Sequence, residues 1–414
     1  MNPEILEMLS AVKEASRQMA LIPAARRRDA LRHMAQQLML RREEILRANG
    51  TDRQEAMEEK LSQSRINILT ILEKDIQAMA DFFLQVAEYE DPVGKLLEEH
   101  VRENLRREKR LQPLGVVAMV YEARPSVITD CAALCMRSGN ALLLRGSSHC
   151  HRTDETIVSC LKDALKLADI APETITLISG DHELTYELAK QDRYIDLMIL
   201  RGGYSCLEDI KSQATVPVIG AGPGNCHIYI DESAKPEMAL AIVHNSKVPR
   251  PLACNATETI LVNRQWAAEN LSGLLHMLTE NGISLRGSQE VCDLTPGMGL
   301  AEEADWAQEY FAPTVAVKLV ADVQEAVWHI NRYRTPHTEC IITEDESNAR
   351  YFQSFVEANV VCWNASTRLT DGIEFGMGGE MGISTQKYPV GGPIGITHLM
   401  QEKYYLIGNG ALRQ

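Results

Sequence analysis

The chain has 414 residues, 45% of them hydrophobic and 24% charged, and a formal net charge of −15 at pH 7. This length is greater than one ordinary hydrophobic core can organise, so it predicts two or three domains. The negative charge argues against nucleic acid as a partner. The apolar runs are far shorter than the roughly 20 residues of a membrane-spanning helix, and the N-terminus has no secretory or transit pattern. We therefore expect no contact with membranes.

The ten cysteines form no C-x-x-C pair and no regular framework. This spacing disfavours disulfides and a structural zinc site, and it predicts a reducing, cytoplasmic location. His149, Cys150 and His151 are consecutive, and consecutive side chains seldom converge on one tetrahedral metal ion. We therefore expect no bound metal.

Residues 3–87 have the pattern of helices. Ile5, Leu9, Val12 and Met19 recur near the 3.6-residue period, so each helix should bury one face. A strongly charged segment that starts at His100 then leads into the apolar run GVVAMVY, the first pattern of a buried strand.

From that run onward, strand patterns alternate with helical ones. The expected strands are 115–121, 141–144, 174–178, 196–200 and 216–219, and the expected helices are 126–137, 153–167, 183–190 and 204–213. This alternation predicts a parallel, doubly wound α/β sheet, whose ligands lie at the carboxyl ends of the strands. The motifs EARP, RGSS and RGG occur at those ends and suit a dinucleotide or ribose phosphate, although G-x-G-x-x-G is absent.

A second α/β pattern follows. Its expected strands are 226–231, 258–262, 312–320 and 339–345, and its expected helices are 236–245, 267–280 and 323–333. The last part of the chain is rich in glycine, and we expect it to return and pair with another element.

Cys254 lies in the polar, turn-prone segment NSKVPRPLACNATET, immediately before an expected strand. Cations at Lys247 and Arg250 and backbone N–H groups could lower the pKa of its thiol, which is the property of a nucleophilic cysteine. The alternative is a small hydrophobic residue packed at the start of a strand. The segment by itself leaves both interpretations open.

The Cys254 segment resembles the active-cysteine segment of the gamma-glutamyl phosphate reductase family, in the aldehyde dehydrogenase superfamily. Four further segments resemble that family in the same order: VYEARPSVITDCAALCMRSGNALLLRG, VPVIGAGPGNCHIYIDES, HTECIITED and WNASTRLTDGIEFGMGGEMGISTQK. Departures from the family pattern occur at Ser147, Val248 and Pro249 and after Lys387. The resemblance covers residues 115–387 and also fits the helical N-terminus.

The resemblance implies an aldehyde dehydrogenase-like α/β fold with two doubly wound parallel-sheet domains, a helical N-terminus and a small β arm for oligomerisation. The expected domains are an NADPH-binding domain of residues 1–98 and 112–225, a catalytic domain of residues 226–375, and an oligomerisation arm of residues 99–111 and 376–414. We expect a homodimer or tetramer.

The same resemblance implies NADPH-dependent reduction of L-glutamyl 5-phosphate to L-glutamate 5-semialdehyde, with release of phosphate, in proline biosynthesis. Cys254 would attack the acyl phosphate and form a thioester, which hydride from NADPH would reduce. Aldehyde dehydrogenases that hydrolyse their thioester use a glutamate upstream of the cysteine as base. The corresponding segment here, Ile219 to Asn225, contains no carboxylate.

Site residues follow from the matching motifs. The expected cofactor-binding residues are Glu122, Ala123, Arg145, Gly146, Ser147, Ser148, Gly202 and Gly203. The expected substrate-binding residues are Arg124, Lys247, Arg250, Asn364, Ser366, Thr367 and Arg368.

Two other functions compete with the acyl-phosphate reductase. One is an aldehyde dehydrogenase that oxidises a semialdehyde, against which the missing carboxylate counts. The other is a non-catalytic scaffold for a partner such as glutamate 5-kinase, the enzyme that would supply the unstable substrate. An active reductase could also contact that kinase transiently.

Overall fold

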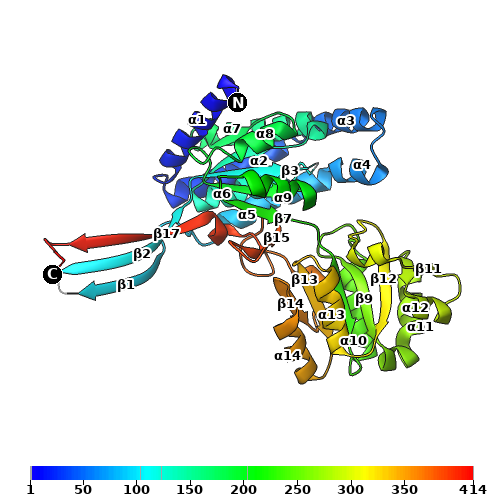
Figure 1. Ribbon diagram of the computed structural model, residues 1–414. Helices are drawn as coiled ribbons and strands as arrows, with labels where there is room; N and C mark the ends of the chain where they lie inside the picture. The colour runs from blue at the N-terminus through cyan, green and yellow to red at the C-terminus, as the bar shows by residue number, and fades with distance from the viewer. Residues whose placement is uncertain (1, 103, 123, 203, 414) are drawn as a thin grey trace. The chain divides into compact units, whose positions relative to one another are not determined.

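The computed structural model describes residues 2–102, 104–122, 124–202 and 204–413. The chain forms two compact units. Unit 1 comprises Met1–Ala221, Gly376–Gly382 and Ile394–Gln414, and unit 2 comprises Gly222–Phe375 and Ile383–Pro393. Figure 1 shows one parallel sheet with flanking helices in each unit.

The N-terminal part of unit 1 is helical, as the sequence predicted. Its helices are α1 (Pro3–Met19), α2 (Ala24–Leu40), α3 (Arg42–Glu58), α4 (Gln63–Leu69) and α5 (Glu73–Glu88). Helix α1 starts where the Asn2 side chain accepts a hydrogen bond from the Glu4 N–H, and Leu9, Val12 and Met19 on one face are buried. The spacing of the apolar residues therefore determined which face packs inward.

Unit 1 contains a five-stranded parallel sheet in the order β5-β4-β3-β6-β7. The strands are β3 (Val116–Tyr121), β4 (Ala141–Arg145), β5 (Ile175–Leu177), β6 (Leu197–Arg201) and β7 (Val218–Ala221). The helices between them are α6 (Val127–Ser138), α7 (His151–Leu167), α8 (His182–Leu188) and α9 (Tyr204–Gln213). This confirms the predicted doubly wound sheet, and the strand order reverses at β3, where such sheets bind their ligands.

The core of unit 1 explains why α1 belongs to this sheet. Leu9 and Val12 of α1 pack in one hydrophobic cluster with Val116 of β3, Met198 of β6 and Leu207 of α9. Helix α1 therefore covers the same face of the sheet as α9.

Unit 2 contains a seven-stranded sheet, β11-β10-β12-β9-β8-β13-β14, with parallel pairing throughout. The strands are β8 (Cys226–Ile230), β9 (Thr257–Asn263), β10 (Ser284–Gly287), β11 (Gly299–Leu300), β12 (Thr314–Val320), β13 (Thr338–Ile342) and β14 (Val360–Trp363). The helices are α10 (Pro236–Lys247), α11 (Arg264–Glu280), α12 (Gln289–Leu294), α13 (Val323–Tyr333) and α14 (Glu346–Phe355). The four long strands were predicted, whereas α14 and the shorter elements β10, β11, β14 and α12 were not. Short elements carry little periodic signal.

A separate three-stranded antiparallel sheet forms an arm of unit 1. It contains β1 (Leu96–Arg102), β2 (Leu105–Pro113) and β17 (Met400–Gly408), with β2 in the centre. The predicted pairing of the charged segment with the C-terminal part of the chain is therefore present, although the arm begins at Leu96. Lys109 of β2 binds Glu98 at 3.3 Å and Glu402 at 2.6 Å, so charges cross-link all three strands.

The remaining short elements are β15 (Ile383–Thr385), β16 (Gly391–Pro393) and the 3₁₀ turns Ser148–Cys150, Pro172–Thr174, Glu303–Ala307, Thr367–Leu369 and Ile396–Leu399. No helix in the described part of the chain is both long enough and apolar enough to cross a membrane.

Candidate functional site

A pocket in unit 1 lies at the carboxyl ends of β3, β4 and β6, where the strand order reverses. Of the predicted cofactor-binding residues, it brings together Glu122, Arg145 and Gly202. Its other lining residues are Val120, Tyr121, His182, Thr185, Leu200, Arg201, Leu207 and Ile210. The position is the one at which a parallel doubly wound sheet holds a dinucleotide.

The loop after β4 packs closely against α7 and β3. Arg145 is largely buried, and its Nη2 donates to the Gly180 carbonyl oxygen at 3.1 Å. A Cβ on Gly146 would lie 2.2 Å from Asp154 Oδ2, so no side chain fits between this loop and α7. That carboxylate oxygen also accepts a hydrogen bond from the Tyr121 hydroxyl at 2.7 Å. Glycine is therefore required at position 146 for close packing.

The other predicted cofactor residues occupy different places. Ser147 caps the following 3₁₀ turn by accepting from the His149 N–H, and Ser148 is exposed. Neither they nor Gly146 are among the residues that line the pocket. Ala123 and Gly203 lie outside the described residues.

Sequence analysis missed two residues that line the pocket, His182 and Thr185, both on α8. They follow β5 in the chain and reach the pocket only because the sheet places β5 next to β4. The motif RGG gave a signal for Arg201, which also lines the pocket.

Asp130 interacts electrostatically with Arg201, which lines this pocket, and with Arg124. Burial raises the pKa of Asp130, in the first turn of α6, to about 7, and the opposing charges of Arg201 and Arg124 limit that rise. Arg124, the expected substrate-binding residue after β3, therefore has a carboxyl group within electrostatic range.

In unit 2, Cys254 lies in the loop of residues 248–256 between α10 and β9, here termed the Cys254 loop. Of the nine cysteines whose side chains are described, seven are buried, whereas Cys254 and Cys292 are partly exposed. Burial raises the pKa of the thiols of Cys131, Cys226 and Cys340 well above their ordinary value. Cys254 therefore has the accessibility that a nucleophile needs and that most other thiols of the chain lack.

Strand β8 and the residues before it support the Cys254 backbone. The Cys226 thiol donates to the Cys254 carbonyl oxygen at 3.4 Å. A Cβ on Gly224 would lie 1.7 Å from that oxygen, so the backbone of Gly224 is packed directly against it. The Ala256 N–H closes a turn on the Ala253 carbonyl oxygen at 2.9 Å. The position of Cys254 is thus fixed by its own turn and by β8.

The segment NASTR lies against the Cys254 loop. The Thr367 hydroxyl donates to the Asn255 carbonyl oxygen at 2.6 Å, and Asn255 Nδ2 donates to the Thr370 carbonyl oxygen at 3.0 Å. The structure therefore brings the segment, which sequence reasoning chose as an anion cradle, next to Cys254.

Several of the expected substrate residues use their side chains inside the protein instead. The Ser366 hydroxyl pairs with that of Ser246 at 2.9 Å, the Thr367 hydroxyl is committed to Asn255, and Asn364 bonds both backbone groups of Thr343. These side chains therefore already have partners that shape the loop, and their role in binding the substrate stays a prediction. Arg250 is exposed and Arg368 is partly exposed.

Lys247 requires the clearest correction. It was expected to bind the substrate, but its side chain is fully buried, and its Nζ lies 2.7 Å from Glu258 Oε2. Burial lowers the pKa of Lys247 against the opposing effect of Glu258, and burial raises the pKa of Glu258 to about 8. An ammonium group enclosed with its own carboxylate does not meet a substrate phosphate.

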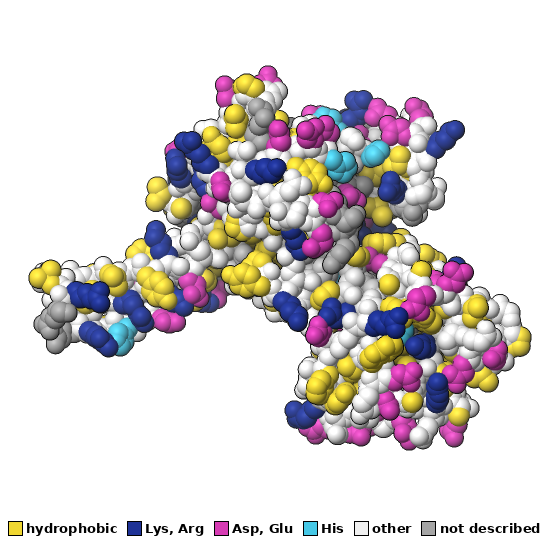
Figure 2. Space-filling view, in the orientation of Figure 1, with side chains coloured by type: hydrophobic (Ala, Val, Ile, Leu, Met, Phe, Trp, Pro, Cys, Tyr) yellow, Lys and Arg dark blue, Asp and Glu magenta, His cyan; other side chains and the backbone are white. Residues whose placement is uncertain are grey.

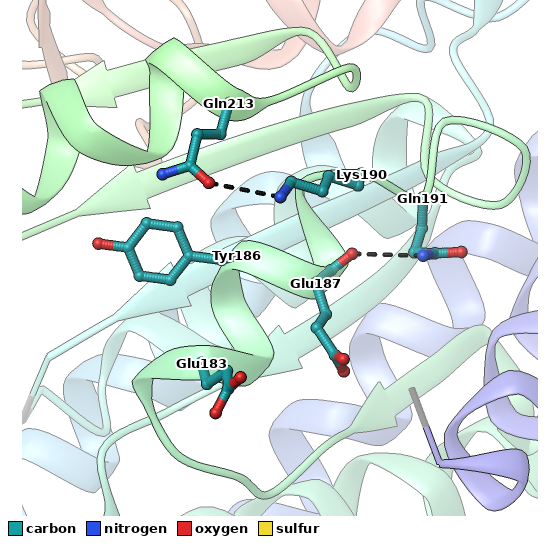
Figure 3. Close-up of a pocket in the computed structure, with 6 residues that line it drawn as sticks. All are labelled: Glu183, Tyr186, Glu187, Lys190, Gln191 and Gln213. Atoms are coloured by element: carbon teal, nitrogen blue, oxygen red, sulfur yellow. Dashed lines mark hydrogen bonds between the residues drawn. The ribbon is translucent and has the colours of Figure 1, made fainter.

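A second hollow lies on the outer surface of α8 and α9 (Figure 3). Its lining residues are Glu183, Tyr186, Glu187, Lys190, Gln191 and Gln213, and Lys190 Nζ donates to Gln213 Oε1 at 3.3 Å. None of the residues predicted to bind cofactor or substrate lines this hollow.

Comparisons with known proteins found relatives that match this chain along nearly its whole length. The model of the aldehyde dehydrogenase family matches residues 2–285. The chain is 44% identical to gamma-glutamyl phosphate reductase of Bacillus velezensis and 42% identical to that of Geobacillus kaustophilus, over 99% of this chain and 99% of each relative. The crystal structure of gamma-glutamyl phosphate reductase from Thermotoga maritima matches with a TM-score of 0.93 at 37% identity, over 99% of this chain and 100% of that chain.

Proposed function

We propose that this chain, which belongs to the gamma-glutamyl phosphate reductases of the aldehyde dehydrogenase family, reduces L-glutamyl 5-phosphate to L-glutamate 5-semialdehyde and releases phosphate, with NADPH as cofactor. The reaction belongs to proline biosynthesis and would take place in the cytoplasm. The observation that carries the proposal is the partly exposed thiol of Cys254 on a loop whose backbone is fixed, in a chain that matches these reductases over its full length.

The chemistry starts at the sulfur of Cys254. Its thiolate attacks the carbonyl carbon of the acyl phosphate, the new carbon–sulfur bond forms, and the bond to the phosphate oxygen breaks with its electron pair. Phosphate is a good leaving group, so this step requires cations and N–H donors more than a general acid. NADPH, when bound, would supply the hydride that reduces the resulting thioester. Cleavage of the carbon–sulfur bond then releases the aldehyde and restores the thiolate.

The residues at the carboxyl ends of the unit 1 strands fit a nicotinamide dinucleotide. Arg145 would face the ribose phosphate that distinguishes NADPH from NADH, and Glu122 and Gly202 line the same pocket. Gly146, Ser147 and Ser148 stay in the proposed cofactor set because the motif RGSS that contains them follows Arg145 at the end of β4. Ala123 and Gly203 are included in the proposed cofactor set because they belong to the motifs EARP and RGG.

For the substrate, we assign three cations. Arg250 and Arg368 lie in the Cys254 loop and the adjoining segment, and Arg124 follows β3. Guanidinium groups bind phosphate and carboxylate with paired hydrogen bonds, which suits a substrate that carries both. Asn364, Ser366 and Thr367 would then contribute the shape of the loop and its backbone N–H groups.

The segment from Ile219 to Asn225 favours reduction over hydrolysis. It contains no carboxylate, and Asn225 Nδ2 is occupied by the carbonyl oxygens of Trp306 and Tyr333. Without a base there to activate water, the thioester survives until hydride reaches it.

The deciding experiment is the reverse reaction, in which glutamate semialdehyde, phosphate and NADP are given to the native protein and to Cys254→Ser. We expect phosphate-dependent formation of NADPH by the native protein, loss of turnover in Cys254→Ser, and unchanged circular dichroism. Cys292→Ser, which alters the other partly exposed thiol, should retain full activity. Turnover without phosphate would instead support an aldehyde dehydrogenase that oxidises the semialdehyde, and activity in Cys254→Ser would overturn the proposed role of the thiol.

A further inference from the structure

A buried salt bridge spans the Cys254 loop. Lys247 is the last residue of α10, Glu258 is the second residue of β9, and the two are eleven positions apart in sequence. Lys247 Nζ and Glu258 Oε2 lie 2.7 Å apart, and the two side chains are 0% and 1% exposed. The bridge therefore joins the two elements that carry the loop, at its base.

Stability alone does not explain a pair of this kind. Removing two charges from water costs several kcal/mol for each ion, and apolar residues of similar volume often stabilise such positions equally well or better. Burial works against the charged form of both groups here, since it lowers the pKa of Lys247 and raises the pKa of Glu258 to about 8. A function that needs fixed geometry is the better reason for its presence.

The salt bridge is also connected to the backbone of Cys254. Lys247 and Glu258 both lie within electrostatic range of the Cys226 thiol. That thiol donates its hydrogen bond to the Cys254 carbonyl oxygen. The bridge thus interacts electrostatically with the buried thiol that supports the Cys254 backbone.

We propose that the Lys247–Glu258 salt bridge positions Cys254 for attack on the substrate carbonyl carbon, so that Lys247 and Glu258 are positioning residues for the reaction. The inference deepens the proposed function and depends on it. The bridge holds the end of α10 and the start of β9 at one separation, and this fixes the ends of a loop that has no regular secondary structure of its own. Displacement of a reacting group by about 1 Å can lower a rate by about 100-fold. If the ends of the Cys254 loop were held less firmly, turnover would therefore fall more than substrate binding.

The test removes both charges together, because a single apolar substitution would leave the other charge buried and unpaired. In Lys247→Met/Glu258→Leu, we expect kcat of the reverse reaction to fall by at least about tenfold. We expect KM for the semialdehyde and the affinity for NADPH, measured by fluorescence quenching, to change less than about twofold, because neither side chain contacts the substrate.

The matched control is Lys235→Met/Glu344→Leu. This pair also joins a lysine to a glutamate in unit 2, with its atoms 2.6 Å apart, but its side chains are 67% and 40% exposed. It should leave kcat unchanged. Lys247→Arg/Glu258→Asp lengthens the cationic side chain, shortens the carboxylate side chain and keeps an ion pair. This variant should recover most of the lost kcat.

Unchanged kcat in Lys247→Met/Glu258→Leu would overturn the inference, as would an equal loss in the exposed control. If circular dichroism shows the buried double variant to be unfolded, Glu258→Gln decides the matter, since it removes the ion pair with Lys247 and keeps the size of the side chain. A loss of kcat of fivefold or more in folded Glu258→Gln supports positioning, and an unchanged value contradicts it. Failure of the proposed function would appear separately, as activity in Cys254→Ser.

Discussion

Gly224 and Cys254 are in direct backbone contact, so close that a Cβ on Gly224 would lie 1.7 Å from the Cys254 carbonyl oxygen. The same oxygen accepts the hydrogen bond from the Cys226 thiol. The strand that opens unit 2 is thus a direct support for the loop that carries the proposed nucleophile.

Gly224→Ala should therefore reduce turnover strongly. The new methyl group has to displace the Cys254 backbone, and we expect kcat to fall by at least about tenfold while NADPH affinity is retained. The control is Gly273→Ala in α11, where a Cβ meets nothing within 4 Å. That substitution should keep activity and raise stability by up to about 1 kcal/mol, because alanine favours a helix over glycine. Equal kcat values for the two variants would contradict the contact.

Asn255→Ala tests the link between the Cys254 loop and Thr370, which follows the segment NASTR by two residues. It removes the hydrogen bond to the Thr370 carbonyl oxygen at a buried position, and we expect the free energy of unfolding in urea to fall by about 1–3 kcal/mol. Asn281→Ala also removes a side chain to backbone bond, to Met277, but at an exposed site, and should cost less. A larger loss for Asn281→Ala would count against a buried link.

Arg145→Gln tests the choice of cofactor. If the guanidinium group contacts the ribose phosphate, KM for NADPH should rise by about tenfold or more while KM for NADH changes little, since NADH lacks that phosphate. Arg152→Gln, an exposed arginine in the following helix that pairs with Glu55, is the control and should affect neither value. A parallel increase in both KM values would mean that Arg145 supports the fold of the pocket and does not select the cofactor.

Acid sensitivity should depend on His337. Burial lowers the pKa of this histidine to about 4, so the folded protein keeps it neutral while the unfolded chain takes up a proton below about pH 6.5. Stability is therefore lost as the pH falls from about 6.5 towards 4, by up to about 1.4 kcal/mol per pH unit for one group.

His337→Gln should make the dependence of stability on pH less steep across that range, as measured by urea unfolding at pH 5 and pH 7. His329, whose pKa burial lowers to about 2, would still contribute. The exposed His276 provides the control, and His276→Gln should leave the slope unchanged. An unaltered slope in His337→Gln would show that this histidine does not become protonated on unfolding.

From the exposed apolar side chains of the arm we predict that the protein is an oligomer. Exposed apolar side chains occur on its strands, at Leu96, Val101, Leu406 and Ile407, and Figure 2 shows hydrophobic atoms on its surface. We expect light scattering to give the mass of a homodimer or tetramer, and Leu406→Glu to lower that mass because a charge disfavours burial in an interface. Leu21→Glu, at an 84% exposed position outside the arm, should not change it. A monomeric native protein would refute the assignment.

The sequence by itself determined the fold class and the position of the thiol. Strand and helix periodicities are local properties, so β3, α6, α9 and α13 could be predicted within about one residue of their observed bounds. Cys254 stood out for a similar reason, because the turn-forming and charged residues around it are its neighbours in the chain.

Only the tertiary structure decided what the flanking residues do. Lys247 is charged and close to Cys254 in sequence, and it was expected to face the substrate, but the packing of α10 and β9 encloses it with Glu258. His182 lines the pocket because the sheet places β5, which precedes its helix, next to β4. No local pattern in the sequence encodes this strand order. Burial and partnership depend on contacts between residues far apart in the chain, and these contacts exist only once the sheets are assembled.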